Sequence, residues 1–270
     1  MEHEFWHNAR EQGKTGWRQK KYNSRLLRYW PMLELPADAV VLVPLCGDTP
    51  DMHWLWQQGH HVVGCDLSEA AIKRFLETHG ITATVIEHGE QNGSQNSDQV
   101  SGEVGSEVSS ETTGTTERDP TVPPVREYRS ERLRLISGDF LQLQAGQLGP
   151  IDAFYDRAAT VALPPPIRAR YAAMLASIID SVKTGRDTAG EMNPGSRLSG
   201  LLISMDYDQN QMSGPPFSVP DTEIHNLYGE AFELVKLGSA EGPEILGSLK
   251  ERGLTTLQES VFKLDGRIPG

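Results

Sequence analysis

The fold is decided by one stretch of the sequence, VLVPLCGDTPDMHWLWQQGHHVVGCDLSE, at residues 41–69. Its unbroken apolar beginning predicts a buried strand, DMHWLWQQG predicts a helix that ends at Gly59, and HVVGCD predicts a second strand. This strand–helix–strand order is typical of a nucleotide-binding crossover, and the second strand ends at an acid, Asp66. The turn after the first strand, however, contains one glycine, Gly47, where a dinucleotide-binding fingerprint has three.

The position of Asp66 and the missing glycines together indicate the class of ligand. An acid at the end of the second strand can accept hydrogen bonds from two ribose hydroxyls. In NAD enzymes the additional glycines let a pyrophosphate approach the helix N-terminus, which an adenosine ligand without phosphate does not require. S-adenosylmethionine is such a ligand, so the pattern favours a methyltransferase. Two alternatives stay open: another Rossmann enzyme, or a chance pattern in which Asp66 only caps the next helix.

The rest of the chain continues the alternation of strands and helices. Further strands are predicted in ITATVIEH, LRLISGDF, IDAFYDRAA, GLLISMDYD, FELVKLG and TTLQESVFKL. Helices are predicted in RLLRYWPML, in residues 68–79 with Ser68 as the cap, in residues 167–182 and in DTEIHNLYG. Repeated strand–helix–strand units predict an α/β fold with a mainly parallel sheet that is covered on both faces.

Two segments interrupt this pattern within a predicted single domain of residues 1–270. Residues 91–122 are rich in Ser, Thr, Gly, Gln and Glu and have hardly any large apolar side chain. Such a composition cannot bury enough apolar surface to offset its ordering entropy, so a disordered insertion is expected, with a regulatory tail as the alternative. Residues 184–200 are predicted to be a shorter surface loop.

Composition and charge restrict the partners and the compartment. The net charge is -12, and residues 88–128 contribute half of it, with eight acids and two bases, so a nucleic-acid partner is not expected. No apolar run approaches the about 20 residues that span a bilayer, and the N-terminus lacks the pattern of a signal peptide. Two cysteines, Cys46 and Cys65, form no disulfide framework. We therefore expect a cytoplasmic monomer that acts on a small molecule.

Other candidate residues have simpler interpretations. Trp54 and Trp56 lie two apart on a helix and are assigned to packing. Cys46 follows a buried strand without an assigned base, which favours a core residue over a nucleophile. His60 and His61 are expected in a solvated turn. No histidine spacing indicates a metal site, and none is predicted.

Several ordered motifs resemble the thiopurine S-methyltransferase family. They are FWHNAREQGKTGWRQ, the stretch at residues 41–72, IDAFYDRAATVALPP and SMDYDQNQMSGPPFSVPDTEIHNLYG. The resemblance covers nearly the whole chain except residues 91–122 and 184–200. It implies the class I methyltransferase fold, a seven-stranded, mainly parallel Rossmann-like sheet with helices on both faces. It also implies methyl transfer from S-adenosylmethionine to sulfur, or to selenium or tellurium in some bacterial members.

The resemblance also implies the residues of the site. Cofactor contacts are assigned to Trp6, Arg10, Leu45, Asp66, Gly138, Asp139 and Arg157, with Asp66 as the ribose acid. Substrate contacts are assigned to Trp17, Pro215, Pro216 and Phe217. Residues 6–17 are the N-terminal lid by this resemblance. Arg10 stands where relatives usually have a second lid tryptophan, which is expected to change cofactor packing or acceptor preference. Trp17 replaces a phenylalanine and is bulkier, so a smaller acceptor pocket is expected.

Arg157 is the expected catalytic residue, at the junction of cofactor and acceptor, because an arginine can steer or stabilise an anionic acceptor. A structural ion pair of Arg157 with Asp156 or Asp139 is the alternative. No general base is identified, since the sulfonium methyl is already activated and the enzyme has only to align and desolvate a soft nucleophile. A halide methyltransferase, a non-catalytic S-adenosylmethionine-binding scaffold and a nicotinamide-dependent oxidoreductase stay open as other functions.

Overall fold

The computed structural model describes residues 21–87, 125–184 and 197–267 of the chain. Side chains are described in these ranges except at residues 180–184. The predicted insertion at residues 91–122 and the predicted site residues Trp6, Arg10 and Trp17 lie outside the described residues.

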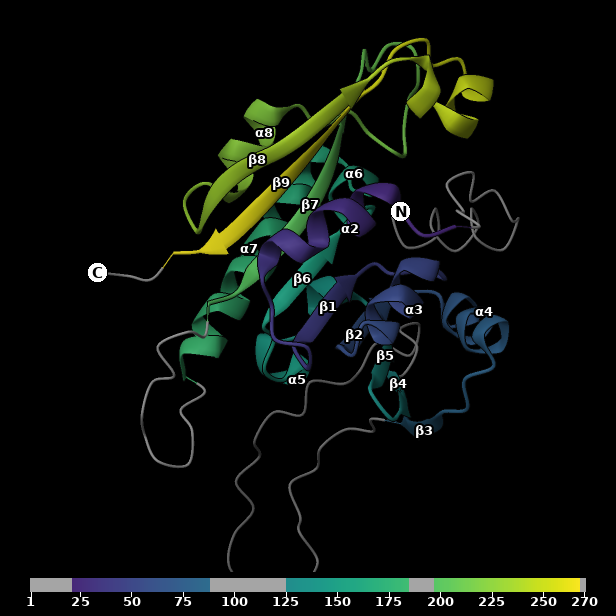
Figure 1. Cartoon of the computed structure of the whole chain (residues 1–270), viewed down its shortest axis with the longest axis vertical. Coiled ribbons are helices and arrows are strands. Elements are labelled where there is room, and N and C mark those ends of the chain that lie inside the picture. Colours follow the sequence, from purple (N-terminus) through teal and green to yellow (C-terminus); the bar gives the residue numbers. More distant parts are fainter. Residues whose placement is uncertain (1–20, 88–124, 185–196, 268–270) are drawn as a thin grey trace, which may run out of the picture.

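One mixed sheet of nine strands organises the described part of the chain, in the order β3-β4-β5-β2-β1-β6-β7-β9-β8 (Figure 1). The strands are β1 (Val40–Pro44), β2 (His61–Asp66), β3 (Thr84–Glu87), β4 (Arg126–Ser130), β5 (Leu133–Ser137), β6 (Ala153–Asp156), β7 (Ser199–Asp206), β8 (Phe232–Glu241) and β9 (Gln258–Gly266). The five central strands β5, β2, β1, β6 and β7 pair in parallel, and the remaining neighbours pair antiparallel.

The α/β fold predicted from the sequence is confirmed, but the number of strands is larger than seven. The part of the sheet that runs β5-β2-β1-β6-β7-β9-β8 has the expected seven strands. Strands β3 and β4 add an antiparallel pair at one edge. Strand β4 was missed because its sequence REYRS is polar. Its Glu127 is nevertheless buried, since Arg134 and Arg129 pair with its carboxylate.

Two groups of helices cover the two faces of the sheet (Figure 1). One group consists of α2 (Ser24–Tyr29), the 3-10 helix η1 (Trp30–Leu33), α3 (Pro50–Gln57) and α4 (Glu69–His79). The other consists of η2 (Phe140–Gln142), α5 (Ala145–Leu148), α6 (Ala159–Ala162), α7 (Pro165–Thr184), α8 (Asp221–Tyr228), η3 (Pro243–Ile245) and η4 (Gly247–Arg252).

Strand β1 shows why its sequence is apolar throughout. Val41 and Val43 pack with the first group of helices, and Leu42 packs with the second. Successive side chains of a strand point to opposite faces, so a central strand between two helical layers must be apolar at every position. The prediction of a buried strand here is confirmed.

Local signals also set the helix ends. The Ser68 side chain accepts a hydrogen bond from the Ala71 backbone N–H, and α4 ends where Gly80 adopts a left-handed conformation with φ 63°. This confirms the helix expected at residues 68–79. Strand β7 begins at Ser199, so the last two residues of the loop expected at residues 184–200 belong to the sheet.

The expectation that His60 is solvated is wrong. Its side chain is 5% exposed, and the Trp30 indole N–H donates a hydrogen bond of 3.0 Å to His60 Nε2. Burial lowers the pKa of His60, which favours the neutral ring that accepts this bond. The neighbouring His61 is exposed, as expected.

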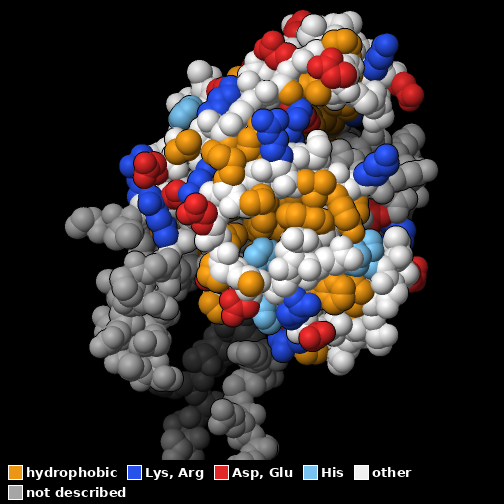
Figure 2. Space-filling model, in the orientation of Figure 1, with side chains coloured by type: hydrophobic (Ala, Val, Ile, Leu, Met, Phe, Trp, Pro, Cys, Tyr) orange, Lys and Arg blue, Asp and Glu red, His pale blue; other side chains and the backbone are white. Residues whose placement is uncertain are grey.

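The surface seen in Figure 2 has apolar side chains gathered across its middle and interspersed basic and acidic side chains around them. Among the described residues, the large apolar side chains that are exposed are Leu27, Met32, Val85 and Val235. None of the helices in the described ranges combines the length and hydropathy that crossing a bilayer demands.

Candidate active site

The carboxyl ends of four neighbouring parallel strands bring the predicted site residues to one edge of the sheet. Leu45 follows β1, Asp66 ends β2, Gly138 follows β5 and Arg157 follows β6. These strands are adjacent in the order β5-β2-β1-β6. Ligands of open parallel sheets bind at this edge, so the convergence marks the candidate site.

The turn after β1 has an unusual backbone that leaves room beside it. Leu45 has φ 49° and Gly47 has φ 55°, and both values lie in the left-handed region that favours glycine. A Cβ atom placed on Gly47 would meet no other atom within 4 Å. The single glycine therefore serves the turn, and open space adjoins it where a ligand can approach.

Asp66 is the fixed acid of this site. Its side chain is buried, Oδ2 accepts a hydrogen bond of 2.8 Å from the Gly47 N–H, and Oδ1 accepts one of 2.7 Å from the Ser68 N–H. Ser68, and not Asp66, caps α4. The alternative in which Asp66 only caps the helix therefore does not describe its contacts.

The next strand contributes Gly138 and Asp139. The Gly138 N–H donates to the Asp66 carbonyl oxygen at 3.0 Å, which joins the two strand ends. The Asp139 carboxylate caps η2 by accepting from the Leu141 N–H at 2.9 Å. Both residues thus lie beside Asp66, as the predicted cofactor contacts require.

Arg157 lies at the other side of the site. Its neighbour Asp156 is fully buried and accepts hydrogen bonds from Thr160, Ala159 and the Tyr171 hydroxyl, while burial raises the pKa of this carboxyl. Within the described ranges, no carboxylate lies within the 4.0 Å of the Arg157 guanidinium that an ion pair needs, so the alternative of a structural pair with Asp156 is not realised.

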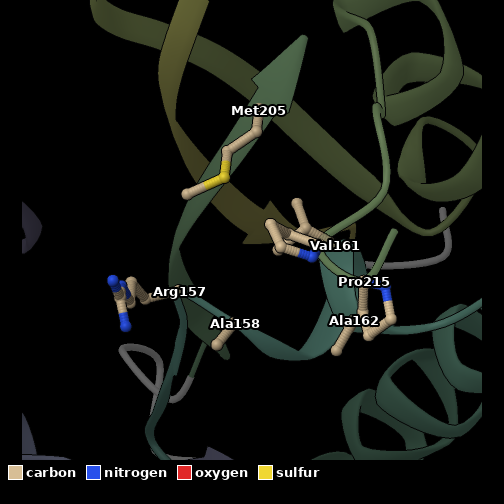
Figure 3. Close-up of a pocket in the computed structure, with 7 residues that line it drawn as sticks. Arg157, Ala158, Val161, Ala162, Met205 and Pro215 are labelled. Carbon is tan, nitrogen blue, oxygen red and sulfur yellow. The ribbon is translucent and has the colours of Figure 1, made fainter. Parts of the chain in front are cut away.

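A small cavity adjoins Arg157. Its other lining residues are apolar: Ala158, Val161, Ala162, Met205, Pro215 and Pro216. Figure 3 shows the Arg157 guanidinium directed away from Val161, Ala162 and Pro215. As far as the described residues line it, the cavity is therefore an apolar recess with the cationic side chain of Arg157 at its margin.

Long-range contacts hold the loop that supplies Pro215 and Pro216. The Tyr207 hydroxyl donates to the Pro216 carbonyl at 2.5 Å, and Arg252 donates to the Pro215 carbonyl at 2.7 Å. The Phe217 N–H donates to the Val161 carbonyl at 2.6 Å. The backbone of this loop is therefore fixed relative to α6 and β7.

Phe217, a predicted substrate contact, has a different environment from the two prolines. Its ring lies under the guanidinium of the buried Arg168, with 5.7 Å from Cζ to the ring centroid. Arg168 also donates to the Leu163 carbonyl at 2.8 Å and pairs with Glu223. The ring is half-buried and is not among the described residues that line the cavity.

The cavity also includes residues that the sequence did not single out. Met205 lies near the carboxyl end of β7, and Val161 lies in α6. Strand order was the available signal for Met205, because β7 is the parallel neighbour of β6. No local pattern marks Val161, whose position depends on how α6 packs.

The two cysteines and the two tryptophans have the predicted structural roles. Cys46 and Cys65 are buried, and burial raises the pKa of the Cys65 thiol well above its usual value. Trp54 and Trp56 pack at the margin of the core, and Arg132 lies over the Trp56 ring. The packing interpretation is confirmed for these side chains.

Comparisons with known proteins show the family of the chain. The family model described as Thiopurine S-methyltransferase (TPMT) matches residues 1–109 and 103–267. A thiopurine S-methyltransferase from Pseudomonas fluorescens (strain Pf0-1) is 34% identical over 269 residues, covering 98% of this chain and 100% of the relative. One from Bordetella petrii is 36% identical over 264 residues, covering 98% of each chain.

A solved structure shows the same fold at much lower identity. The Burkholderia thailandensis 1,6-didemethyltoxoflavin-N1-methyltransferase, with bound S-adenosylhomocysteine, aligns with a TM-score of 0.53 and 14% identity. The alignment covers 98% of this chain and 87% of that one. With the matching family model and the two full-length relatives, it follows that the chain belongs to the thiopurine S-methyltransferase family, a family of S-adenosylmethionine-dependent S-methyltransferases.

Proposed function

We propose that this protein transfers the methyl group of S-adenosylmethionine to the sulfur, or a related chalcogen, of a small acceptor. The observation that carries the proposal is the juxtaposition at one sheet edge of a fixed acid, Asp66, and an apolar cavity with Arg157 at its margin. The family membership of the chain supports the same activity.

The residues present fit S-adenosylmethionine. A carboxylate can accept about four hydrogen bonds, so Asp66 can accept from ribose hydroxyls in addition to its two backbone partners. The open space beside Gly47 admits a ligand next to Leu45, and Gly138 with Asp139 lies on the side proposed for the adenine. By family resemblance, Trp6 and Arg10 complete the cofactor contacts. When bound, S-adenosylmethionine supplies a methyl group activated by its sulfonium.

The cavity favours a soft anionic acceptor. Its apolar walls at Pro215, Pro216, Met205 and Val161 exclude water from the nucleophile, which makes the electrostatic effect of Arg157 larger than in water. Arg157 remains charged at working pH and is proposed to orient the anion toward the methyl carbon. By the family resemblance, Phe217 and, from the lid, Trp17 are proposed to contact the acceptor.

The reaction balances without a general base in the protein. An acceptor thiolate forms the new sulfur–carbon bond, and the electron pair of the broken carbon–sulfonium bond stays on the cofactor sulfur. A thiol must first lose its proton to solvent, and reference thiols have a pKa of about 8.5. Acidic aromatic thiols and hydrogen chalcogenides are therefore the acceptors expected to react fastest near neutral pH.

Labelled methyl transfer tests the proposal. The purified protein is incubated with methyl-labelled S-adenosylmethionine and, separately, with aromatic thiols, aliphatic thiols, selenite, tellurite and iodide. We expect calorimetric binding of the cofactor and fastest transfer to an acidic thiol or a chalcogen anion. Fastest transfer to iodide would instead identify a halide methyltransferase, and binding without any turnover would identify a scaffold.

The cysteines and the sheet bear on the compartment and the domain division of the chain. The chain has only two cysteines, which form no disulfide framework, so we propose a reducing compartment, the cytoplasm. We also propose one methyltransferase domain over residues 1–270, because the described strands form a single sheet, and a chain that acts as a monomer.

A further inference from the structure

Asp51 is a buried carboxylate that the proposed reaction does not use. It is the second residue of α3 and has no exposed surface. Oδ1 accepts a hydrogen bond of 2.7 Å from the Asn23 backbone N–H, and Oδ2 accepts one of 3.0 Å from the Tyr155 hydroxyl. The carboxylate thus joins α3 to the residue that precedes α2 and to β6.

Asp51 also interacts electrostatically with the proposed catalytic residue. Burial raises the pKa of the Asp51 carboxyl, and the Asn23 N–H and the positive charge of Arg157 lower it. Tyr155, which donates to Asp51, precedes Arg157 by two residues at the end of β6. The guanidinium is directed away from the apolar side of the cavity (Figure 3). Side chains two apart along a strand point to the same face, so Arg157 follows β6 on the face of Tyr155 and of its partner Asp51.

The Asp51 carboxylate also lies beside the two residues that precede α2, Tyr22 and Asn23. The Tyr22 hydroxyl contacts His53 Nδ1 at 3.1 Å and donates to Gln57 at 3.1 Å, so it binds the outer turns of α3. The Asn23 side chain caps α2 while its backbone N–H binds Asp51. Residues 22 and 23 are therefore fixed on α3, and Asp51 provides the buried contact.

We propose that Asp51 is a positioning residue that orients the Arg157 guanidinium and connects it to Asn23, the residue that precedes α2. The inference rests on the proposed methyltransferase function. A carboxylate held by two hydrogen bonds is a fixed negative charge, and a fixed charge restricts where a neighbouring guanidinium lies. Removal of the Asp51 charge leaves Arg157 without this restraint. Because methyl transfer depends on alignment, we expect this removal to lower kcat/KM more than it lowers the affinity for the cofactor.

The first test is a double-mutant cycle on the full chain. Asp51→Asn, which keeps the shape and removes the charge, is expected to lower kcat/KM for a thiol acceptor about 10- to 100-fold. Its affinity for S-adenosylhomocysteine is expected to change less than about threefold. In an Arg157→Gln background the same substitution is expected to change kcat/KM less than about twofold, because the two residues act together. An equal factor in both backgrounds would assign Asp51 a merely structural role and overturn the proposal.

Two further variants separate charge from hydrogen bonding and from general effects. Asp152→Asn is the matched control, because the Asp152 carboxylate also accepts a backbone N–H, that of Val40, at 2.8 Å, but at the opposite end of β1 and β6. It is expected to leave kcat/KM unchanged. Tyr155→Phe keeps the negative charge and is expected to lower kcat/KM less than Asp51→Asn does. An equal loss would assign the effect to the hydrogen bond and overturn the role of the charge.

A second test needs neither turnover nor a folded Asp51 variant. The pKa of the Asp51 carboxyl is measured by carbon-13 NMR in the wild-type protein and in Arg157→Gln. Loss of the guanidinium is expected to raise this pKa further, and an unchanged pKa would overturn the proposal. Absence of methyl transfer in the wild type would reject the proposed function, and the NMR comparison would still decide the coupling of Asp51 with Arg157.

Discussion

The two sides of the candidate site are built by different kinds of contact. On the cofactor side, Asp66 binds the backbone of Gly47 and Ser68, and Gly138 binds the Asp66 carbonyl, so neighbouring strand ends fix one another. On the acceptor side, the loop at residues 213–217 depends on side chains of separate elements, above all Arg168 and Arg252.

This difference predicts how each side responds to substitution. The backbone bond between Gly138 and Asp66 and the pairing of β2 with β1 and β5 remain when the Asp66 side chain is removed, so we expect a loss there mainly in ligand affinity. A loop held by buried side chains loses its shape together with stability when one of them is removed. The predictions below separate the two responses.

The largest expected effect is on the acceptor side, at Arg168. Arg168→Ala removes the partner of Glu223 and of the Leu163 carbonyl and the cation above Phe217. We expect the free energy of unfolding to fall by about 3 kcal/mol, because breaking a buried ion pair leaves polar groups without partners. Urea unfolding measures this effect. Arg170→Ala on the same helix is the control, since Arg170 is exposed, and a similar loss in both variants would contradict the prediction.

The next effect is on the cofactor side, at Asp66. Asp66→Ala is expected to weaken S-adenosylmethionine binding by about 1.5–3 kcal/mol, the range for hydrogen bonds to a charged group. Calorimetry on the folded variant measures the affinity. Asp66→Asn serves as the control for local structure, because its amide oxygen still accepts from one of the two backbone N–H groups. Unchanged affinity in the alanine variant would reject Asp66 as the ribose acid.

Substitutions of Arg157 test the residue that lies between the cofactor side and the acceptor side. Transfer rates are expected to fall in the order wild type, Arg157→Lys, Arg157→Ala, with a total loss of about 10- to 100-fold, while cofactor affinity changes less. Because Arg157 makes no ion pair within the described ranges, thermal stability is expected to stay nearly constant. Single-turnover methyl transfer and melting temperature are measured for all three proteins. Equal rates would remove Arg157 from the mechanism, and parallel losses of stability and rate would indicate a structural role.

The same contrast explains how much of the molecule was predictable. The alternation of strands and helices apart from β4, the cap of α4 at Ser68 and the position of Asp66 at the end of β2 are local signals, and the structure confirms each of them. Strand β4 escaped prediction because Glu127 is buried only through arginines that pair with it in the fold. His60 escaped for a similar reason, since its partner Trp30 lies 30 residues earlier in the chain.

On the acceptor side, local sequence was informative only for part of the site. The motif at residues 213–217 marked Pro215 and Pro216, which line the cavity, and Phe217, whose ring lies under the Arg168 guanidinium. The partners Arg168, Tyr207 and Arg252 have no spacing that points to this loop. Their role depends on packing between helices and strands that are distant in the sequence, which a periodic pattern does not encode.

The smallest expected effect is on neither side of the site, at the predicted insertion. Glu87, the last residue of β3, pairs with Arg126, the first residue of β4, so the two ends of the intervening segment are neighbours in the sheet. Deleting residues 91–122 leaves six residues, 88–90 and 123–125, to connect this antiparallel pair. Loop-closure entropy changes slowly with length, so we expect a stabilisation of at most about 1.5 kcal/mol and nearly unchanged methyl transfer.

Unfolding in urea and turnover with the best acceptor test this deletion. A matched control replaces residues 91–122 with a Gly/Ser linker of equal length, which keeps the loop entropy and removes the sequence. If the deletion and the linker both retain turnover, the segment is dispensable for the chemistry. If the linker variant loses turnover while its stability is unchanged, the sequence of residues 91–122 takes part in the reaction, and the assignment of the site to the sheet edge alone is incomplete.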